Sequence, residues 1–200
     1  MDLSTFIARP AWPVAEVAAL PGRGKGSLMR DWAVHIERRR GRAAVEQIRA
    51  ATGISAAELP DQPPKDAWVR IAWQCQLTRA VADLWFGGDL AALEPALRED
   101  AIRARDRWID RVLRATISPR RILAAGARIH ATLYDVGAVV TDVDKRRAHI
   151  AWRGARFMAE PTWGALQAFA IRGLFAATNH PEPRIEATPG DEGLTFDVYF

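Results

Sequence analysis

Cysteine is almost missing from this sequence, since Cys75 is the only one in 200 residues. One thiol can form neither an internal disulfide nor a site with several thiolate ligands. Cys75 lies in an apolar helical pattern, which indicates a small buried hydrophobe rather than a reactive thiol. The histidines are too dispersed for a zinc motif on one element, so we expect no metal site. They are His35, His130, His149 and His180.

Long hydrophobic runs are absent as well. No stretch approaches the roughly 18 consecutive apolar residues that a membrane span needs. Residues 1–21 also lack the basic start and apolar centre of a signal peptide. We therefore expect a cytoplasmic protein with no membrane partner. Hydrophobic residues make up 49% of the chain and charged residues 26%, as in ordinary globular proteins, and 200 residues fit one domain.

No recognisable catalytic pattern is present. Residues 22–27, GRGKGS, have the glycines of a phosphate-binding loop, but their spacing differs from that motif, and prolines rather than a strand precede them. A flexible loop before a helix is the better interpretation. No serine has a nucleophile-elbow context with a matching histidine and acid. We favour a protein that is not an enzyme, catalysis stays an open alternative, and we name no catalytic residue.

The chain divides into an arm and a domain. Residues 1–26 contain several prolines and glycines, and their apolar residues have no sustained period, which predicts an irregular N-terminal arm. Residues 27–200 are predicted to form a single α+β domain, with a helical layer over residues 27–126 and a sheet layer over residues 127–200.

Helical periodicity dominates the first layer. Ser27 and Gly53 are expected to bound the first helix, with a break near Gly41. A first-turn proline follows Ser118, which is typical of a helix start. The other predicted helices cover residues 68–86, 90–112 and 118–126.

The period then changes to two, which predicts strands. Residues 136–152 form a hairpin pattern around a polar turn, Pro161 opens a helix over residues 161–178, and residues 184–200 form a second hairpin pattern. The C-terminal half is therefore a ββαββ unit. We predict an α+β fold in which a helical N-terminal half packs on a four-stranded antiparallel sheet with one crossing helix.

Three features together resemble one known superfamily. The helical half contains Lys25-Gly26-Ser27-Leu28, a Gly88-Asp89 break follows a long helix, and the ββαββ unit ends with GLTFDVYF at residues 193–200. Over residues 23–200 this order resembles the haem-nitric-oxide-binding and 4-vinyl-reductase-like superfamily, and most of all its uncharacterised myxobacterial-type members of about this length. The resemblance implies a small-molecule-binding or sensory module, often a homodimer, with its pocket between the helical layer and the sheet.

The sequence departs from the haem-binding members of that superfamily. They use a proximal histidine together with a Tyr-x-Ser-x-Arg motif for the haem propionates, whereas DVGA follows Tyr134 here. The 4-vinyl-reductase-like members often carry cysteines near the last hairpin, and this chain has none after Cys75. We therefore expect no haem and name no cofactor.

Aromatic residues border the predicted sheet and its crossing helix. Aromatic side chains stabilise cores and also line pockets for flat apolar ligands, so both interpretations remain open for each of them. His130 precedes the first predicted strand, where it is either a pocket ligand or general base or a structural histidine. The candidate ligand-binding residues are His130, Tyr134, Trp152, Phe157, Trp163 and Phe169.

Positive charge is concentrated in one segment. The formal net charge is +4, and residues 23–49 alone have a balance of +5, so the remainder of the chain is close to neutral. Guanidinium groups pair with oxyanions, so this segment is a candidate for binding an anion or an acidic partner. No aromatic ladder interleaves the charges, which argues against single-stranded nucleic acid. The candidate residues are Arg23, Lys25, Arg38, Arg39, Arg40 and Arg42.

Three functional hypotheses follow. The first is a non-enzymatic sensing or regulatory domain that binds a small apolar or aromatic ligand between helices and sheet. The second is a protein-interaction or scaffold module that binds a protein partner and no ligand. The third is binding of an anionic partner, such as nucleic acid, through residues 23–49.

Overall fold

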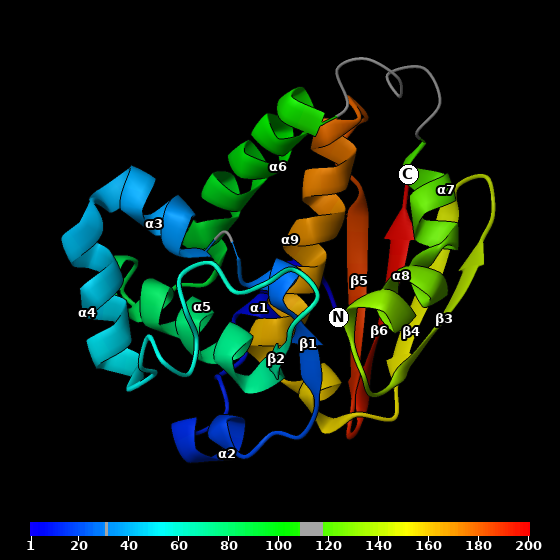
Figure 1. The fold of residues 1–200 in the computed structure, drawn as a ribbon. Coiled ribbons are helices and arrows are strands. Elements are labelled where there is room, and N and C mark those ends of the chain that lie inside the picture. Colours follow the sequence, from blue (N-terminus) through cyan, green and yellow to red (C-terminus); the bar gives the residue numbers. More distant parts are fainter. Residues whose placement is uncertain (31, 109–117) are drawn as a thin grey trace.

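The computed structural model describes residues 1–30, 32–108 and 118–200 (Figure 1). Its main sheet contains β3 (Ala138–Val143), β4 (Arg147–Arg153), β5 (Arg184–Gly190) and β6 (Gly193–Tyr199). The spatial order is β3-β4-β6-β5, and all neighbouring strands are antiparallel. The final strand of the chain therefore lies inside the sheet. The predicted α+β class and the ββαββ unit are confirmed.

One face of this sheet is apolar because side chains alternate along each strand. Trp152 and Leu194 lie opposite each other on β4 and β6, and both are buried. His149 and Asp197 lie opposite each other on the other face, where their side chains are hydrogen-bonded at 2.9 Å. The buried face also carries Val139, Ile150, Ile185, Ala187, Phe196 and Val198.

Helix α9 (Pro161–Ala177) packs on the apolar face. It begins as predicted at Pro161, and the side chain of Glu160 caps it by accepting a hydrogen bond from the backbone N–H of Trp163 at 2.7 Å. The ring of Trp163 meets the ring of Trp152 edge to face, with centroids 5.8 Å apart. Through this contact the first turns of α9 are held against the middle of the sheet.

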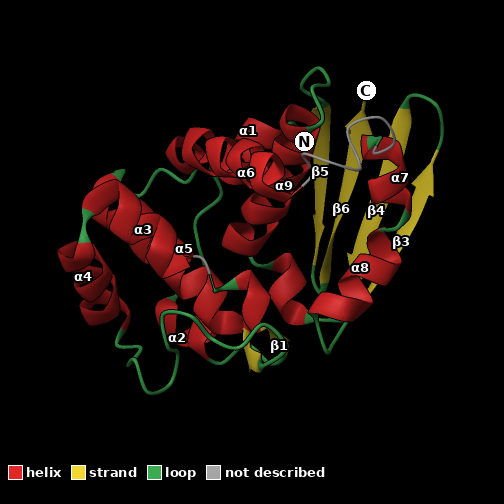
Figure 2. Cartoon of the chain, turned by 45° about the horizontal axis from the view of Figure 1, so that its top comes forward, coloured by secondary structure: helices red, strands yellow, loops and turns green. Residues whose placement is uncertain are grey.

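Helices α7 (Pro119–Ala124) and α8 (Gly126–Leu133) lie along β3 and β4 (Figures 1 and 2). The side chain of Ser118 caps α7, as predicted. Helix α8 corrects the prediction, because the sheet layer was expected to begin at residue 127. Gly126 marks close packing rather than the end of the helical region, since a Cβ atom there would lie 2.9 Å from Cγ2 of Thr141.

The helical half contains α3 (Trp32–Arg40), α4 (Arg42–Thr52), α5 (Ile71–Trp85) and α6 (Glu94–Trp108). Figure 2 shows α3 and α4 at the end of the molecule away from the sheet. The predicted break at Gly41 and the predicted end at Gly53 are confirmed, and both glycines have positive φ. Single 3₁₀ turns cover Gly26–Leu28, Ala91–Leu93 and Arg156–Ala159.

Three predicted helix ends differ from the structure. The helix expected over residues 68–86 begins only at Ile71, because residues 68–70 form a short strand that pairs with residues 23–25. Ser27 lies in a 3₁₀ turn, and the helix that it was expected to start begins only at Trp32. The helix expected over residues 90–112 corresponds to a 3₁₀ turn and α6, and its predicted last four residues, 109–112, lie outside the described residues.

The N-terminal segment is not the irregular arm that its prolines and glycines predict. It forms α1 (Leu3–Ile7), α2 (Val14–Ala18) and β1 (Arg23–Lys25), which pairs with β2 (Trp68–Arg70) in a second, two-stranded sheet. Phe6 on α1 is buried and meets the ring of Phe196 on β6 at 5.8 Å. A short helix can bury an apolar face when it packs against a sheet. Five residues are too few for a periodic pattern to be recognised in the sequence.

Candidate functional site

A pocket of about 470 Å³ lies between α7, α8, α9 and the apolar face of the sheet, with α5 and α6 closing its far side. Its described lining contains no charged side chain, and most of it is aliphatic. The aliphatic wall is formed by Leu28, Leu97, Ile122, Leu123, Ile129, Leu133, Val139, Ile150, Leu166, Ile171 and Leu174.

The structure brings four of the six predicted ligand-binding residues to this pocket, namely His130, Tyr134, Trp152 and Phe169. The other two, Phe157 and Trp163, are fully buried and do not line it.

Phe157 and Trp163 pack against Tyr134 and do not line the pocket. The ring of Tyr134 lies 5.6 Å from that of Phe157 and 6.1 Å from that of Trp163, measured between centroids. These two residues therefore position the aromatic wall of the pocket rather than form its surface.

His130 and Tyr134 are held together as a pair. They are four residues apart at the end of α8, and their rings stack with centroids 4.7 Å apart and an interplanar angle of 24°. Tyr134 is fixed further by a β-bridge to Gly24, beside which the side chain of Asp135 accepts hydrogen bonds from Arg23. Burial raises the pKa of Tyr134 to about 12, so its hydroxyl stays protonated at neutral pH.

The imidazole of His130 uses only one of its nitrogens inside the protein. Its Nε2 lies 3.1 Å from the carbonyl oxygen of Val136, whereas Nδ1 is buried without a partner in the described part of the chain. Burial also lowers the pKa of His130 below its usual 6.5, although hydrogen bonds to the backbone of residues 136 and 137 oppose this shift. The ring is therefore neutral at neutral pH.

A second pocket of about 300 Å³ adjoins the first. It lies among α3, α5 and α6 and shares four lining residues with the larger pocket: Leu28, Gln74, Leu97 and Leu166. Gln74 of α5 lines both, and its Oε1 is buried with no partner among the described residues. Sequence analysis missed Gln74, since nothing in the sequence distinguishes it from Gln76, which lines a different pocket.

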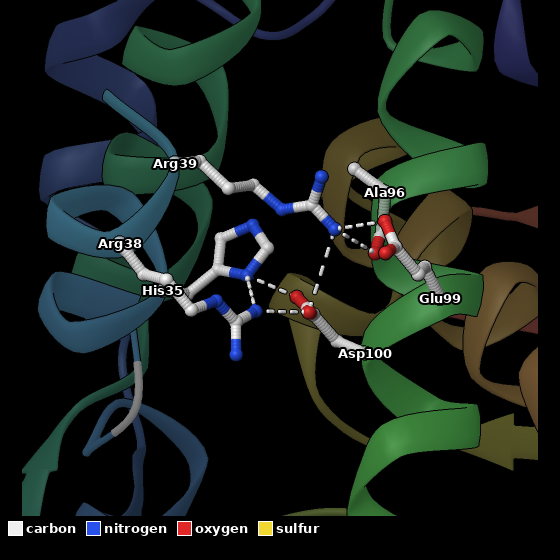
Figure 3. A network of polar contacts seen from close by, with 6 residues as sticks. All are labelled: His35, Arg38, Arg39, Ala96, Glu99 and Asp100. Carbon is white, nitrogen blue, oxygen red and sulfur yellow. Dashed lines mark hydrogen bonds and ion pairs between the residues drawn. The ribbon is translucent and has the colours of Figure 1, made fainter.

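A polar network joins α3 to α6 at the edge of the second pocket (Figure 3). Asp100 receives contacts from His35, Arg38 and Arg39, and Arg39 also donates to Glu99 at 2.7 Å. Burial lowers the pKa of His35, and the nearby Asp100 carboxylate partly opposes this effect. The network fastens two helices whose residues are about sixty positions apart in the chain.

All six predicted anion-binding residues have intramolecular partners. Besides Arg38 and Arg39, Arg23 pairs with Asp135 at 2.7 Å, and Arg42 pairs with Asp61 at 2.8 Å. The other two lie over aromatic rings. Lys25 Nζ is 4.0 Å from the ring of Trp68, and the guanidinium of Arg40 is 4.9 Å from that of Trp85. These contacts do not favour the hypothesis of an anionic partner.

Two further features of the described residues bear on the site. In residues 1–30, 32–108 and 118–200, every helix is too short or too polar to cross a bilayer. The same ranges contain no cluster of three histidine, cysteine, aspartate or glutamate side chains placed to hold a metal ion.

Comparison with solved structures shows that this α+β fold is similar to the fold of haem-nitric-oxide-binding (H-NOX) proteins. The Fe(II) unliganded H-NOX protein from K. algicida matches with a TM-score of 0.58 and 14% identity, covering 88% of this chain and 95% of that chain. A single-residue mutant of it gives 0.60 and 13%, with the same coverage. A phenylalanine-to-leucine variant of Tt H-NOX gives 0.60 and 14%, covering 88% and 94%.

These similarities confirm the fold that the sequence resemblance implied. No family model matches the chain, and no curated protein does. At identities of 13 to 14%, the solved structures establish the fold alone.

Proposed function

We propose that this protein is a small-molecule-sensing domain that holds an apolar or aromatic ligand in the pocket of about 470 Å³ between α7, α8, α9 and the sheet. The observation that carries this proposal is the pocket itself. Its volume lies within the range of roughly 300 to 1,000 Å³ typical of ligand sites, and aliphatic and aromatic walls with few polar groups are typical of such sites. His130, Gln74 and Gln167 are among the polar residues of the lining.

The structural neighbours support this proposal. They are matched over nearly their whole length, and the K. algicida protein is described as Fe(II) unliganded, a state defined by a site for a ligand. This support is an analogy of fold, and the function itself is argued from the pocket of this chain.

Haem is not the ligand that we propose. Another structural neighbour comes from work on the function of heme distortion in the H-NOX family. Haem carries two propionates, which favour cationic partners, and no arginine or lysine occurs in the described lining. His130, the only histidine of that lining, already uses Nε2 on a backbone carbonyl. These residues fit an uncharged ligand better than a haem.

The proposal includes a route for the signal. The second pocket shares Leu28, Gln74 and two other lining residues with the first, and residues of α3 also line it. A ligand that displaces the shared residues would therefore also change the contacts of α3. We propose that α3 and α4 pass ligand occupancy to a protein partner, that the protein acts as a homodimer, and that it does so in the cytoplasm.

Native mass spectrometry of freshly purified protein tests the ligand. A reproducible mass excess over the 22.2 kDa chain, lost on denaturation, is expected. Ala170→Trp should reduce the excess, because Ala170 lines the pocket and a larger side chain there would take up part of its volume. The matched control is Ala43→Trp on the exposed face of α4, which should retain the excess. An excess that is undiminished in a folded Ala170→Trp variant would contradict this location.

A further inference from the structure

We propose that the two adjoining pockets receive one elongated ligand, an unbranched apolar chain with an uncharged polar head. This inference rests on the function proposed above and specifies the ligand. It starts from the residues that line both pockets, which come from a 3₁₀ turn, α5, α6 and α9. Side chains of four separate elements therefore meet where the pockets adjoin. They are Leu28, Gln74, Leu97 and Leu166.

One stripe of apolar side chains runs from the second pocket into the first. Leu93 lines the second pocket, Leu97 lines both, and Ala101 lines the first. Leu93 lies directly before α6, and residues four apart on a helix lie on the same face. From Leu93 to Ala101 the stripe covers about 12 Å of helix. The two pockets therefore share one wall, and a ligand can follow it from one pocket to the other along apolar surface.

Beyond the shared residues the pockets follow different helices. The first pocket continues along α9 from Leu166 to Leu174, a stretch of about 12 Å. The second continues along α5 from Gln74 to Val81, a stretch of about 10 Å. A molecule that occupies both pockets is therefore longer than either stretch, which favours a chain over a compact ring system.

The walls of this joined site are accessible. The four shared residues are only partly buried, and Ala170, which lines the first pocket, is exposed. Partly exposed side chains change rotamer rapidly, and the shared side chains are three leucines and a glutamine, none of them branched at Cβ. The junction can therefore open for a chain without movement of the backbone.

The second pocket supplies a polar end for the ligand. His35 and Asp100 line it, and both are accessible, because their side chains are 18% and 25% exposed. The Asp100 carboxylate repels an anion, whereas Arg38 and Arg39 beside it repel a cation (Figure 3). An uncharged head such as a hydroxyl group suits this end. The first pocket suits the apolar chain, since its described lining contains no charged side chain.

Straight-chain alcohols of increasing length test the inference. Their binding to the full chain is measured by tryptophan fluorescence at about pH 7.5, since Trp152 lines the first pocket and Trp32 the second. As long as the added carbons are buried, the affinity should rise about fourfold for each CH₂ group, the equivalent of about 0.8 kcal/mol. The extended length of 1-octanol is similar to that of the first pocket. The wild type should continue the rise beyond it and bind 1-dodecanol at least about thirtyfold more tightly than 1-octanol.

Thr78→Trp is the matched variant, because Thr78 lines the second pocket and not the first. It should reduce the ratio of the two affinities to below about fivefold, since 1-octanol fits in the first pocket alone and the added carbons of 1-dodecanol lose their place. Ala96→Phe changes the second pocket in the same way and serves where Thr78→Trp does not fold. The control is Ala43→Trp on the exposed face of α4, which should keep the wild-type ratio.

The outcomes separate this inference from the proposed function. A wild-type affinity that stops rising at 1-octanol, or a wild-type ratio in both folded variants of the second pocket, would overturn the inference. Binding of 1-octanol that Ala170→Trp weakens would then leave the proposed function standing. If no alcohol binds although the purified protein carries a mass excess that is lost on denaturation, only the inference fails. If neither binding nor an excess is found, both proposals fail.

Discussion

The guanidinium group of Arg39 donates a hydrogen bond to the carboxylate of Glu99, with 2.7 Å between Nη2 and Oε2. This contact ties α3 to α6, and Asp100 next to Glu99 strengthens it by pairing with Arg38 and His35 (Figure 3). A cluster of arginines that suggests a binding surface in the sequence thus serves to hold two helices together.

Asp100→Asn should lower the free energy of unfolding by about 1 kcal/mol, because it removes the charge that three basic side chains of α3 contact. A larger loss is not expected, because partly exposed ion pairs contribute little to stability. Urea denaturation measures the loss. The control is Asp83→Asn, which affects a single exposed pair with Arg79 within α5 and should cost less than about 0.5 kcal/mol. Equal losses in the two variants would show that the network adds nothing.

Gly137→Ala should destabilise the protein by about 3 kcal/mol, because it combines strain and overlap. Gly137 has φ of +78°, and a Cβ atom there would lie 2.2 Å from Cε of Met158. Gly154 is the control, since its φ is +80° but a Cβ would meet nothing within 4 Å. Gly154→Ala should therefore cost only about 1 kcal/mol. Thermal denaturation compares the two, and a similar loss in both would mean that the Met158 side chain moves away freely.

The stability of the protein should fall as the pH drops from 7.5 to 5, and His130→Phe should reduce this dependence. Burial lowers the pKa of His130, so the unfolded chain takes up a proton below about pH 6.5 more readily than the folded protein does. The stabilising contribution is complete above that pH and is lost below it. His35 has a lowered pKa too and contributes with the same sign, so some dependence should remain in the variant.

Urea denaturation at a series of pH values tests this prediction. The matched control is His180→Gln, which removes an exposed histidine, and the effect of His130→Phe should exceed that of this control. A profile unchanged by His130→Phe would mean that His130 takes up its proton equally well in the folded protein.

Asp61→Asn should cost about 2 kcal/mol at pH 7, because it leaves a buried guanidinium without its charged partner. Asp61 accepts hydrogen bonds from Arg49, which is 8% exposed, and from Arg42. The hydrogen bond from Arg49 lowers the pKa of Asp61 below its usual 3.8. This contribution is therefore complete above pH 3.8 and is lost as the pH falls further.

Chemical denaturation at pH 7 and pH 3 measures both parts of this prediction. Glu46→Gln serves as the control, since the pair of Glu46 with Arg42 at 3.5 Å is exposed, and its loss should be below about 0.5 kcal/mol. If Asp61→Asn costs no more than this control, Arg49 does not depend on the carboxylate.

The sequence by itself determined the sheet and its crossing helix, because their signals are local. A period of two predicts the strands within residues 136–152 and 184–200, and Pro161 fixes the start of α9. The period gives the wrong face for β3, because Val139 is buried whereas Val140 is 56% exposed. The break at Gly41 and the end at Gly53 follow in the same way from conformations that glycine adopts easily.

Only the tertiary structure decided the N-terminal segment, α8 and the polar groups of the pocket. Five residues of α1 carry too short a pattern to be recognised until Phe6 meets Phe196, and Gly126 looks like a helix end until Thr141 is seen beside it. Arg39 looks free until Glu99 is placed opposite. Each of these features depends on contacts between residues far apart in the chain, and such contacts leave no period in the sequence around either partner.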